Sequence, residues 1–169
     1  MTMFEKFGEF DSAEELNKAA EGLKAEGDIE SLKALAIENG IDEMNAEDFA
    51  NGDMTELANV FEAALGKLEV EQSEDSKLYK EQELVSDWID QIKLMAMAGE
   101  NEALAIAVRK KGKSLKGCIG YILKWAFANQ VEVHKDLLAA AGVNAGKVTM
   151  GVPGMRTARR LIREYYLGE

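Results

Sequence analysis

The sequence predicts an all-α protein in which an acidic N-terminal helical region, residues 1–74, precedes a compact C-terminal helical bundle, residues 75–169. Alanine, leucine, glutamate and lysine are abundant and proline occurs once, as Pro153, so helix is favoured almost throughout. Glycines and capping residues separate several apolar stripes that have helical spacing. At 169 residues, the chain is long enough for one domain or two small ones.

The first two predicted helices are defined by their ends. Ser12 and Glu15 form a capping box, which predicts a helix that starts there and ends before Gly27. Asp28 is placed to cap a second helix, which Asn39 and the following glycine close.

Two more helices complete the predicted acidic region. Residues 41–52 predict a short helix anchored by Phe49. A longer helix is predicted from about residue 53 to residue 71, because its apolar residues follow the i, i+3, i+4, i+7 spacing of a buried stripe. The polar, acidic segment 69–77 is the predicted boundary between the two regions.

The C-terminal bundle is predicted to start with a long helix that ends at Gly99 and a shorter one over residues 101–111. Ser114 is placed to cap the next helix. The residues predicted to face the core from that helix are Leu115, Cys118, Ile119, Ile122, Leu123, Ala126 and Phe127.

The last part of the chain contains a short predicted helix, a glycine-rich loop and a strongly amphipathic final helix, residues 155–167. The short helix lies around residues 135–141, and residues 147–150 are the stretch with some strand character. In the C-terminal core we expect Trp88, Ile92, Ile119, Ile122, Leu161 and Tyr165 to be buried together.

Charge is distributed unevenly along the chain. Residues 1–90 carry 25 acidic and 7 basic side chains, whereas residues 91–169 carry 6 acidic and 13 basic ones, for a net charge of −11. Such a chain either has two electrostatically distinct surfaces or pairs its halves against each other. Two solvated faces without a partner are the third interpretation.

Composition argues against several classes of protein. With one cysteine, Cys118, and one histidine, His134, the chain has neither an internal disulfide nor a thiolate or two-histidine zinc site. No apolar run reaches the roughly 20 residues of a membrane span, and the acidic N-terminus does not resemble a signal peptide. Cys118 is interpreted as a core residue and His134 as a capping or surface residue. We expect a soluble, cytoplasmic protein that has no metal or cofactor and is not an enzyme.

One segment, Ala107–Ser114, fits a permissive phosphate-loop pattern in which alanine replaces the first glycine. A phosphate loop follows a buried strand, whereas the residues before this segment follow a helical pattern. Three bulky cations also occupy the loop. We therefore interpret the segment as a helix end with a glycine C-cap, followed by a serine N-cap.

Two basic clusters are the candidate binding residues. On the last helix, four arginines fall within about 100° of one another when residues are placed at the helical spacing. They are Arg156, Arg159, Arg160 and Arg163. The second cluster lies at a predicted helix–helix corner and consists of Arg109, Lys110, Lys111, Lys113 and Lys116. Together they suit phosphates or an acidic protein surface, and the alternative is a solvated face or internal pairing with the acidic half.

The segment KGKSLKGCIGYIL, residues 111–123, resembles small PcfK-like proteins of bacterial conjugative elements and phages. A C-terminal helix with paired tyrosines, here from Gly154 to Tyr166, is a second shared feature, and the resemblance covers about residues 86–169. Parts of that family are described as inhibitors of the Cas9 nuclease, that is, type II anti-CRISPR proteins.

The resemblance implies a phage- or mobile-element-encoded inhibitor that acts by stoichiometric binding to a Cas9-like effector nuclease or its guide-RNA complex. An acidic protein of this kind is able to act as a partial nucleic-acid mimic in the positively charged channel of a nuclease. The alternative is a nucleic-acid-binding or regulatory accessory protein of a conjugative element. The sequence does not specify the oligomeric state.

Overall fold

The computed structural model describes residues 4–80, 82–98 and 102–168, and 67% of them are helical. This confirms the predicted all-α fold, to which one two-stranded sheet is added. In chain order, the described elements are α1 (Ala13–Glu26), α2 (Ile29–Glu38), α3 (Glu43–Asn51), α4 (Val60–Glu74), α5 (Ser76–Tyr79), α6 (Glu83–Met97), α7 (Glu102–Arg109), α8 (Leu115–Ala128), β1 (Val131–Glu132), α9 (Lys135–Ala140), β2 (Thr149–Met150) and α10 (Met155–Leu167). The predicted helix ends at Gly99 and Asn101 lie outside the described residues.

The first two helices begin where the sequence predicts. The Ser12 side chain accepts a hydrogen bond from the Glu15 backbone N–H, and the Asp28 side chain accepts one from that of Ser31. The Glu15 carboxylate accepts from the Asp11 N–H instead of closing the capping box on Ser12. The helices α1, α2 and α3 enclose a first hydrophobic core whose buried members are Leu16, Ala20, Leu32, Leu35, Ala36, Ile41, Ala46, Phe49, Leu57, Ala58 and Ala63.

The long helix α4 differs from its prediction at both ends. It begins at Val60 and not near residue 53, because Asn59 and Glu62 form a complete capping box at that point. Leu57 is buried in the first core but precedes the helix. The polar segment that was expected to separate two regions is helical as far as Glu74, and α5 follows it after one residue.

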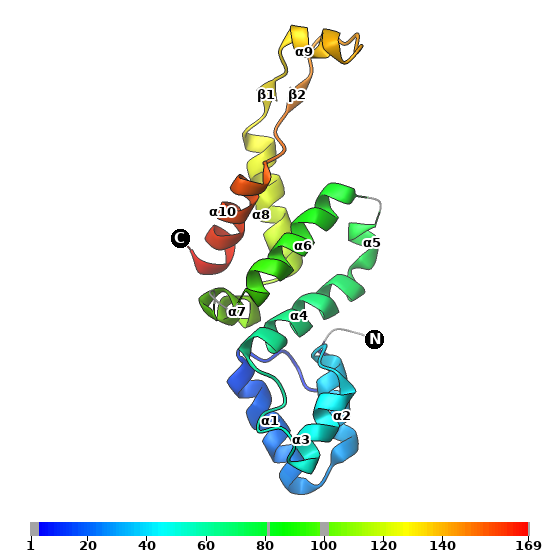
Figure 1. Cartoon of the computed structure of the whole chain (residues 1–169), viewed down its shortest axis with the longest axis vertical. Coiled ribbons are helices and arrows are strands. Elements are labelled where there is room, and N and C mark those ends of the chain that lie inside the picture. The colour runs from blue at the N-terminus through cyan, green and yellow to red at the C-terminus, as the bar shows by residue number, and fades with distance from the viewer. Residues whose placement is uncertain (1–3, 81, 99–101, 169) are drawn as a thin grey trace.

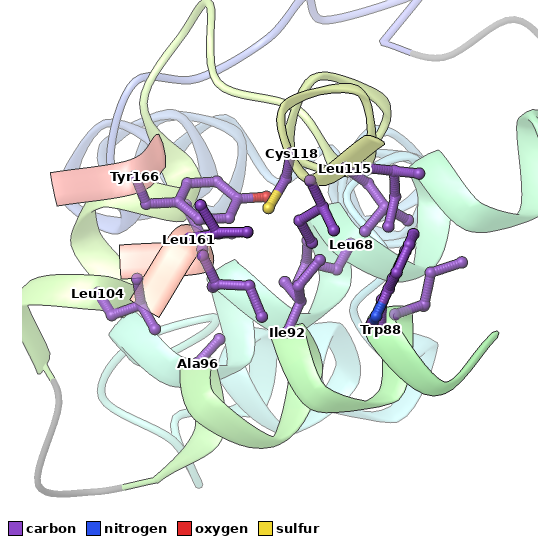
Figure 2. Packing of buried hydrophobic residues seen from close by; sticks show 14 of the residues in the cluster. Leu68, Trp88, Ile92, Ala96, Leu104, Leu115, Cys118, Leu161 and Tyr166 are labelled. Atoms are coloured by element: carbon purple, nitrogen blue, oxygen red, sulfur yellow. The ribbon is translucent and has the colours of Figure 1, made fainter. Parts of the chain in front are cut away.

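The second core lies among α4, α6, α7, α8 and α10. Figure 2 shows Tyr166 reaching toward Cys118, with Leu161, Ile92 and Trp88 in the same packed layer. The predicted burial of Trp88 and Ile92 is confirmed, as is that of the residues Ile119, Ile122 and Leu161.

The predicted burial of Tyr165 is wrong. Tyr166 is the buried tyrosine, and Tyr165 lies half-buried at the edge of the core. The reason is a polar contact, because the Tyr165 hydroxyl accepts a hydrogen bond from the Ser114 backbone N–H at 3.1 Å. Leu123 and Phe127 were also predicted to face the core but are exposed. Leu123 lines a pocket between α8 and the segment of α5 and α6, and Phe127 lies in the last turn of α8.

The two cores meet inside α4. Ala63 belongs to the first hydrophobic cluster and Ala64 to the second. The division into domains 1–74 and 75–169 stays a prediction. Where the end of α2 crosses α4, Gly40 and Gly66 touch backbone to backbone. A Cβ atom on Gly40 would overlap the Gly66 backbone, and one on Gly66 would overlap the Asn39 carbonyl oxygen.

An arm, residues 129–154, projects from the body of the molecule and consists of β1, α9 and β2 (Figure 1). The strand character predicted for residues 147–150 is confirmed by β2, which pairs with β1 in antiparallel register. The sequence analysis did not identify β1. The acidic helices α1 to α3 lie at the opposite end of the molecule (Figure 1).

Candidate functional site

Helix α10 has one side that packs on the core and another that carries the arginines, as the sequence predicts. Its buried residues are Ala158, Leu161, Ile162 and Tyr166. All four arginines of the cluster are exposed. Arg160 forms an ion pair with Glu164 one helical turn away. A row of guanidinium groups therefore faces solvent on an element that the core holds rigidly.

The lysine cluster lies at the corner between α7 and α8. Lys110, Lys111 and Lys116 are exposed, whereas Lys113 is half-buried. The Lys113 ammonium group donates to the backbone carbonyl of Tyr165 and lies 4.8 Å from the centre of the Tyr165 ring. Because Tyr165 also accepts from Ser114 at the start of α8, it joins the lysine corner to the end of α10. At the helical spacing, Tyr165 lies on the side of α10 opposite the four arginines, so this contact is made on the packing side of the helix.

Arg109 does not belong to this surface, and its assignment as a binding residue is wrong. It is fully buried between the two cores. Its guanidinium group donates to the Asn39 side-chain oxygen and to the Ala63 backbone oxygen. Burial lowers the pKa of this guanidinium to about 10, which leaves it charged at neutral pH. Arg109 thus connects α7 to α2 and α4 and is inaccessible to a partner.

The phosphate-loop-like segment is a helix end followed by a helix start, as interpreted from the sequence. Helix α7 ends at Arg109, and Gly112 has a φ of 80°. The Ser114 side chain accepts from the Gly117 backbone N–H at 3.0 Å. The Leu115 N–H donates to the Glu71 carboxylate at 2.5 Å. These backbone N–H groups at the start of α8 already have protein partners.

A buried polar junction lies behind the lysine corner, and the sequence analysis missed it. The Lys67 side chain is 1% exposed, and its ammonium group lies 2.6 Å from the Glu9 carboxylate. It also donates to the backbone oxygen of Lys110 at 3.0 Å. Glu71 lies one turn further along α4, and burial raises the pKa of its carboxyl group. The available signal was the position of Lys67 on the apolar stripe of α4, directly before Leu68.

The uneven distribution of charge along the sequence places acidic and basic residues on different helices. Residues 4–59, which include α1 to α3, contain 16 acidic and 4 basic side chains. Between Glu102 and Glu132 the chain has six basic residues and no acidic one. The helices α1 to α3 lie at one end of the molecule, and α8 and α10 lie between them and the arm (Figure 1). The lysine corner touches the N-terminal segment, where the Lys111 backbone N–H donates to the Asp11 carboxylate at 2.8 Å.

The single cysteine and the single histidine have the positions interpreted from the sequence. Cys118 is fully buried, and burial raises the pKa of its thiol far above the usual range. His134 caps α9, where its Nδ1 atom accepts from the Asp136 backbone N–H at 3.3 Å. Within the described ranges, no three histidine, cysteine or carboxylate side chains converge as metal ligands. No helix in the described part of the chain has both the length and the apolar character needed to cross a membrane.

Comparison with known proteins gives no relatives: no family model, curated protein or solved structure matches this chain. The function of the protein is therefore inferred from its charged surfaces.

Proposed function

We propose that this protein acts by stoichiometric binding, as a phage- or mobile-element-encoded inhibitor of a Cas9-like effector nuclease or its guide-RNA complex. The observation that supports the proposal is that one helical molecule exposes many carboxylates on α1 to α3 and four arginines on one side of α10. Each surface has a counterpart in such a complex, which combines a positively charged nucleic-acid channel with an exposed RNA backbone.

The exposed carboxylates of α1 to α3 are the part of the protein that mimics a nucleic acid. Carboxylates on α1, α2, α3 and the following loop are exposed, and the cations on these helices are few. Placed in a channel that binds an A-form duplex through its backbone, these carboxylates take the position of phosphates. The exposed acidic residues of this surface are Glu14, Glu15, Glu21, Glu26, Asp28, Glu30, Asp42, Glu43, Glu47, Asp53 and Glu56.

The basic face supplies the second contact. Arginine presents a planar fork of donors that matches phosphate oxygens, so the exposed side of α10 suits the backbone of a guide RNA. Lys110, Lys111 and Lys116 form a second exposed basic cluster where α7 leads into α8. No chemistry is required of the protein, because occupation of the complex is itself the inhibitory act.

The test is a titration of the protein against a Cas9–guide complex that cleaves a target duplex, together with a pull-down of the complex by the tagged protein. Inhibition should be complete near one equivalent per complex. The double variant Arg159→Glu, Arg163→Glu should lose binding while its melting temperature stays close to the wild-type value. The matched control is Lys135→Glu, Lys147→Glu, which reverses two exposed charges on the arm, outside both predicted clusters. Undiminished cleavage at a large excess of wild-type protein would reject the proposal.

A second candidate function, a nucleic-acid-binding accessory protein of a conjugative element, is favoured by the exposed arginine side of α10. Binding to free duplex, single-stranded DNA or RNA distinguishes it from the inhibitor. An accessory protein should bind free nucleic acid with strong dependence on salt, and reversing two arginines should reduce the slope of log K against log salt by about 2. An inhibitor should bind the nuclease complex and leave free nucleic acid unbound.

A further inference from the structure

The arm contains a β-ribbon whose two faces differ in polarity. Val131 pairs with Met150 and Glu132 with Thr149, and the ladder continues through a hydrogen bond of 2.8 Å from the Val133 N–H to the Val148 carbonyl. Side chains alternate between the faces of a strand. One face of this ribbon therefore carries Val131, Val133, Val148 and Met150, all of them apolar.

The opposite face is polar and has its own partners. The Glu132 carboxylate lies 3.9 Å from the Lys147 ammonium group, and the Thr149 hydroxyl donates to the Gln130 side-chain oxygen at 2.8 Å. This two-sided pattern is typical of a sheet that packs one face on another layer and leaves the other in solvent.

Among the described residues, this apolar face is only partly covered. Val131 is 69% exposed and Met150 is 61% exposed, whereas Val133 and Val148 are half-buried. None of the described side chains of α9 is buried, and Leu137 is 65% exposed. An isolated two-stranded ribbon is marginally stable in water, and contiguous exposed apolar surface marks an interaction site. The arm is therefore incomplete without an occupant of its apolar face.

We propose that two copies of this chain associate about a twofold axis through the apolar face of the ribbon. The face is self-complementary, because twofold packing of two such ribbons places apolar side chains against apolar side chains in a layer about 10 Å thick. Within residues 129–154, Glu132 and Asp136 balance Lys135 and Lys147, so this surface has no net charge to repel a second copy. The neutral charge also disfavours a nucleic acid as the occupant.

The remaining charges of the molecule permit this arrangement. The acidic helices lie at the end of the molecule away from the arm (Figure 1), so a dimer whose two copies extend in opposite directions from the joined arms keeps its acidic ends far apart. Repulsion between such ends is screened beyond about 10 Å at ordinary salt concentration. Association through the ribbon is independent of what the basic face binds.

The test is sedimentation equilibrium of the full-length chain without nucleic acid, from micromolar to hundreds of micromolar protein. The wild type should be a dimer at the upper concentrations. Val131→Lys should weaken association about tenfold or more, because it inserts a charge into the apolar layer of both copies. Thr149→Lys, on the polar face of the same ribbon, is the matched control and should dimerise like the wild type. Circular dichroism melts should be unchanged for both variants, since the ribbon lies outside both cores.

Three results would overturn the proposal. The first is a monomeric wild type over the whole concentration range, whatever other molecule then proves to bind the arm. The second is equal weakening by the two variants, which would place the contact elsewhere. The third is loss of the dimer at high salt, because association through apolar surface persists there, whereas contact between the acidic end of one copy and the basic face of another does not.

Discussion

Replacing Lys67 by methionine should destabilise the folded protein by about 3–5 kcal/mol, the usual cost of removing one partner from a buried charge network. Methionine has a similar length and fills the site, so the loss arises from polar contacts and not from a cavity. The ammonium group contacts the Glu9 carboxylate at 2.6 Å and the Lys110 and Arg109 carbonyls at 3.0 and 3.4 Å. Glu9 is 30% exposed, so water is able to replace the ammonium group at its carboxylate. Most of the loss in stability therefore comes from the two backbone carbonyls and from buried Glu71, which are left without a partner.

Urea titration followed by circular dichroism at 222 nm measures this difference, and a melting temperature lowered by about 10 °C should accompany it. Lys18→Met is the matched control, because Lys18 is exposed on α1 and its replacement should change stability by about 0.5 kcal/mol or less. A loss below about 1 kcal/mol in the Lys67 variant would refute the idea that this junction holds the two cores together.

Three further predictions concern single side chains in and near the second core. Ile122→Ala should cost about 2–5 kcal/mol in urea titrations because Ile122 is fully buried, and a loss below about 0.5 kcal/mol would mean that α8 packs loosely. The raised pKa of Glu71 means that the folded state holds its proton more tightly than the unfolded chain, so stability should fall as pH rises through the folded pKa. Glu71→Gln should remove this fall in melting temperature with rising pH. A variant with the same dependence of melting temperature on pH as the wild type would show that Glu71 is not the group responsible. Tyr166→Phe should leave stability equal or raise it by about 1 kcal/mol, since the buried hydroxyl has no hydrogen-bond partner among the described residues, and a clear loss in the melt would reveal one.

Helix ends were predictable because they depend on residues that are close in sequence. Ser12, Asp28 and Ser114 each cap a helix through a backbone N–H three residues away. The amphipathic pattern of α10 likewise places its arginines in solvent without any knowledge of the fold. The exact start of α4 was missed because Leu57 continues the apolar spacing upstream of the cap at Asn59.

Burial of charged residues was not predictable, because it depends on contacts between distant segments. Lys67 meets Glu9 across 58 residues of sequence, and Arg109 meets Asn39 across 70. Sequence spacing groups Arg109 with the lysines that follow it, whereas the packing of α7 on α4 turns it inward. The exposure of Phe127, in the last turn of α8, likewise depends on packing against distant segments.

The contact between Gly40 and Gly66 restricts which substitutions the chain tolerates. Gly40 has a φ of 68°, and a methyl group on either residue would occupy the space of the opposite backbone. Alanine at one position is therefore not rescued by a smaller residue at the other, because both are already glycine. Substitution of either glycine is possible only if α2 moves away from α4, and that movement would open the first core. Any distant relative that keeps this crossing should retain glycine at both positions, even where the surface charges have changed completely.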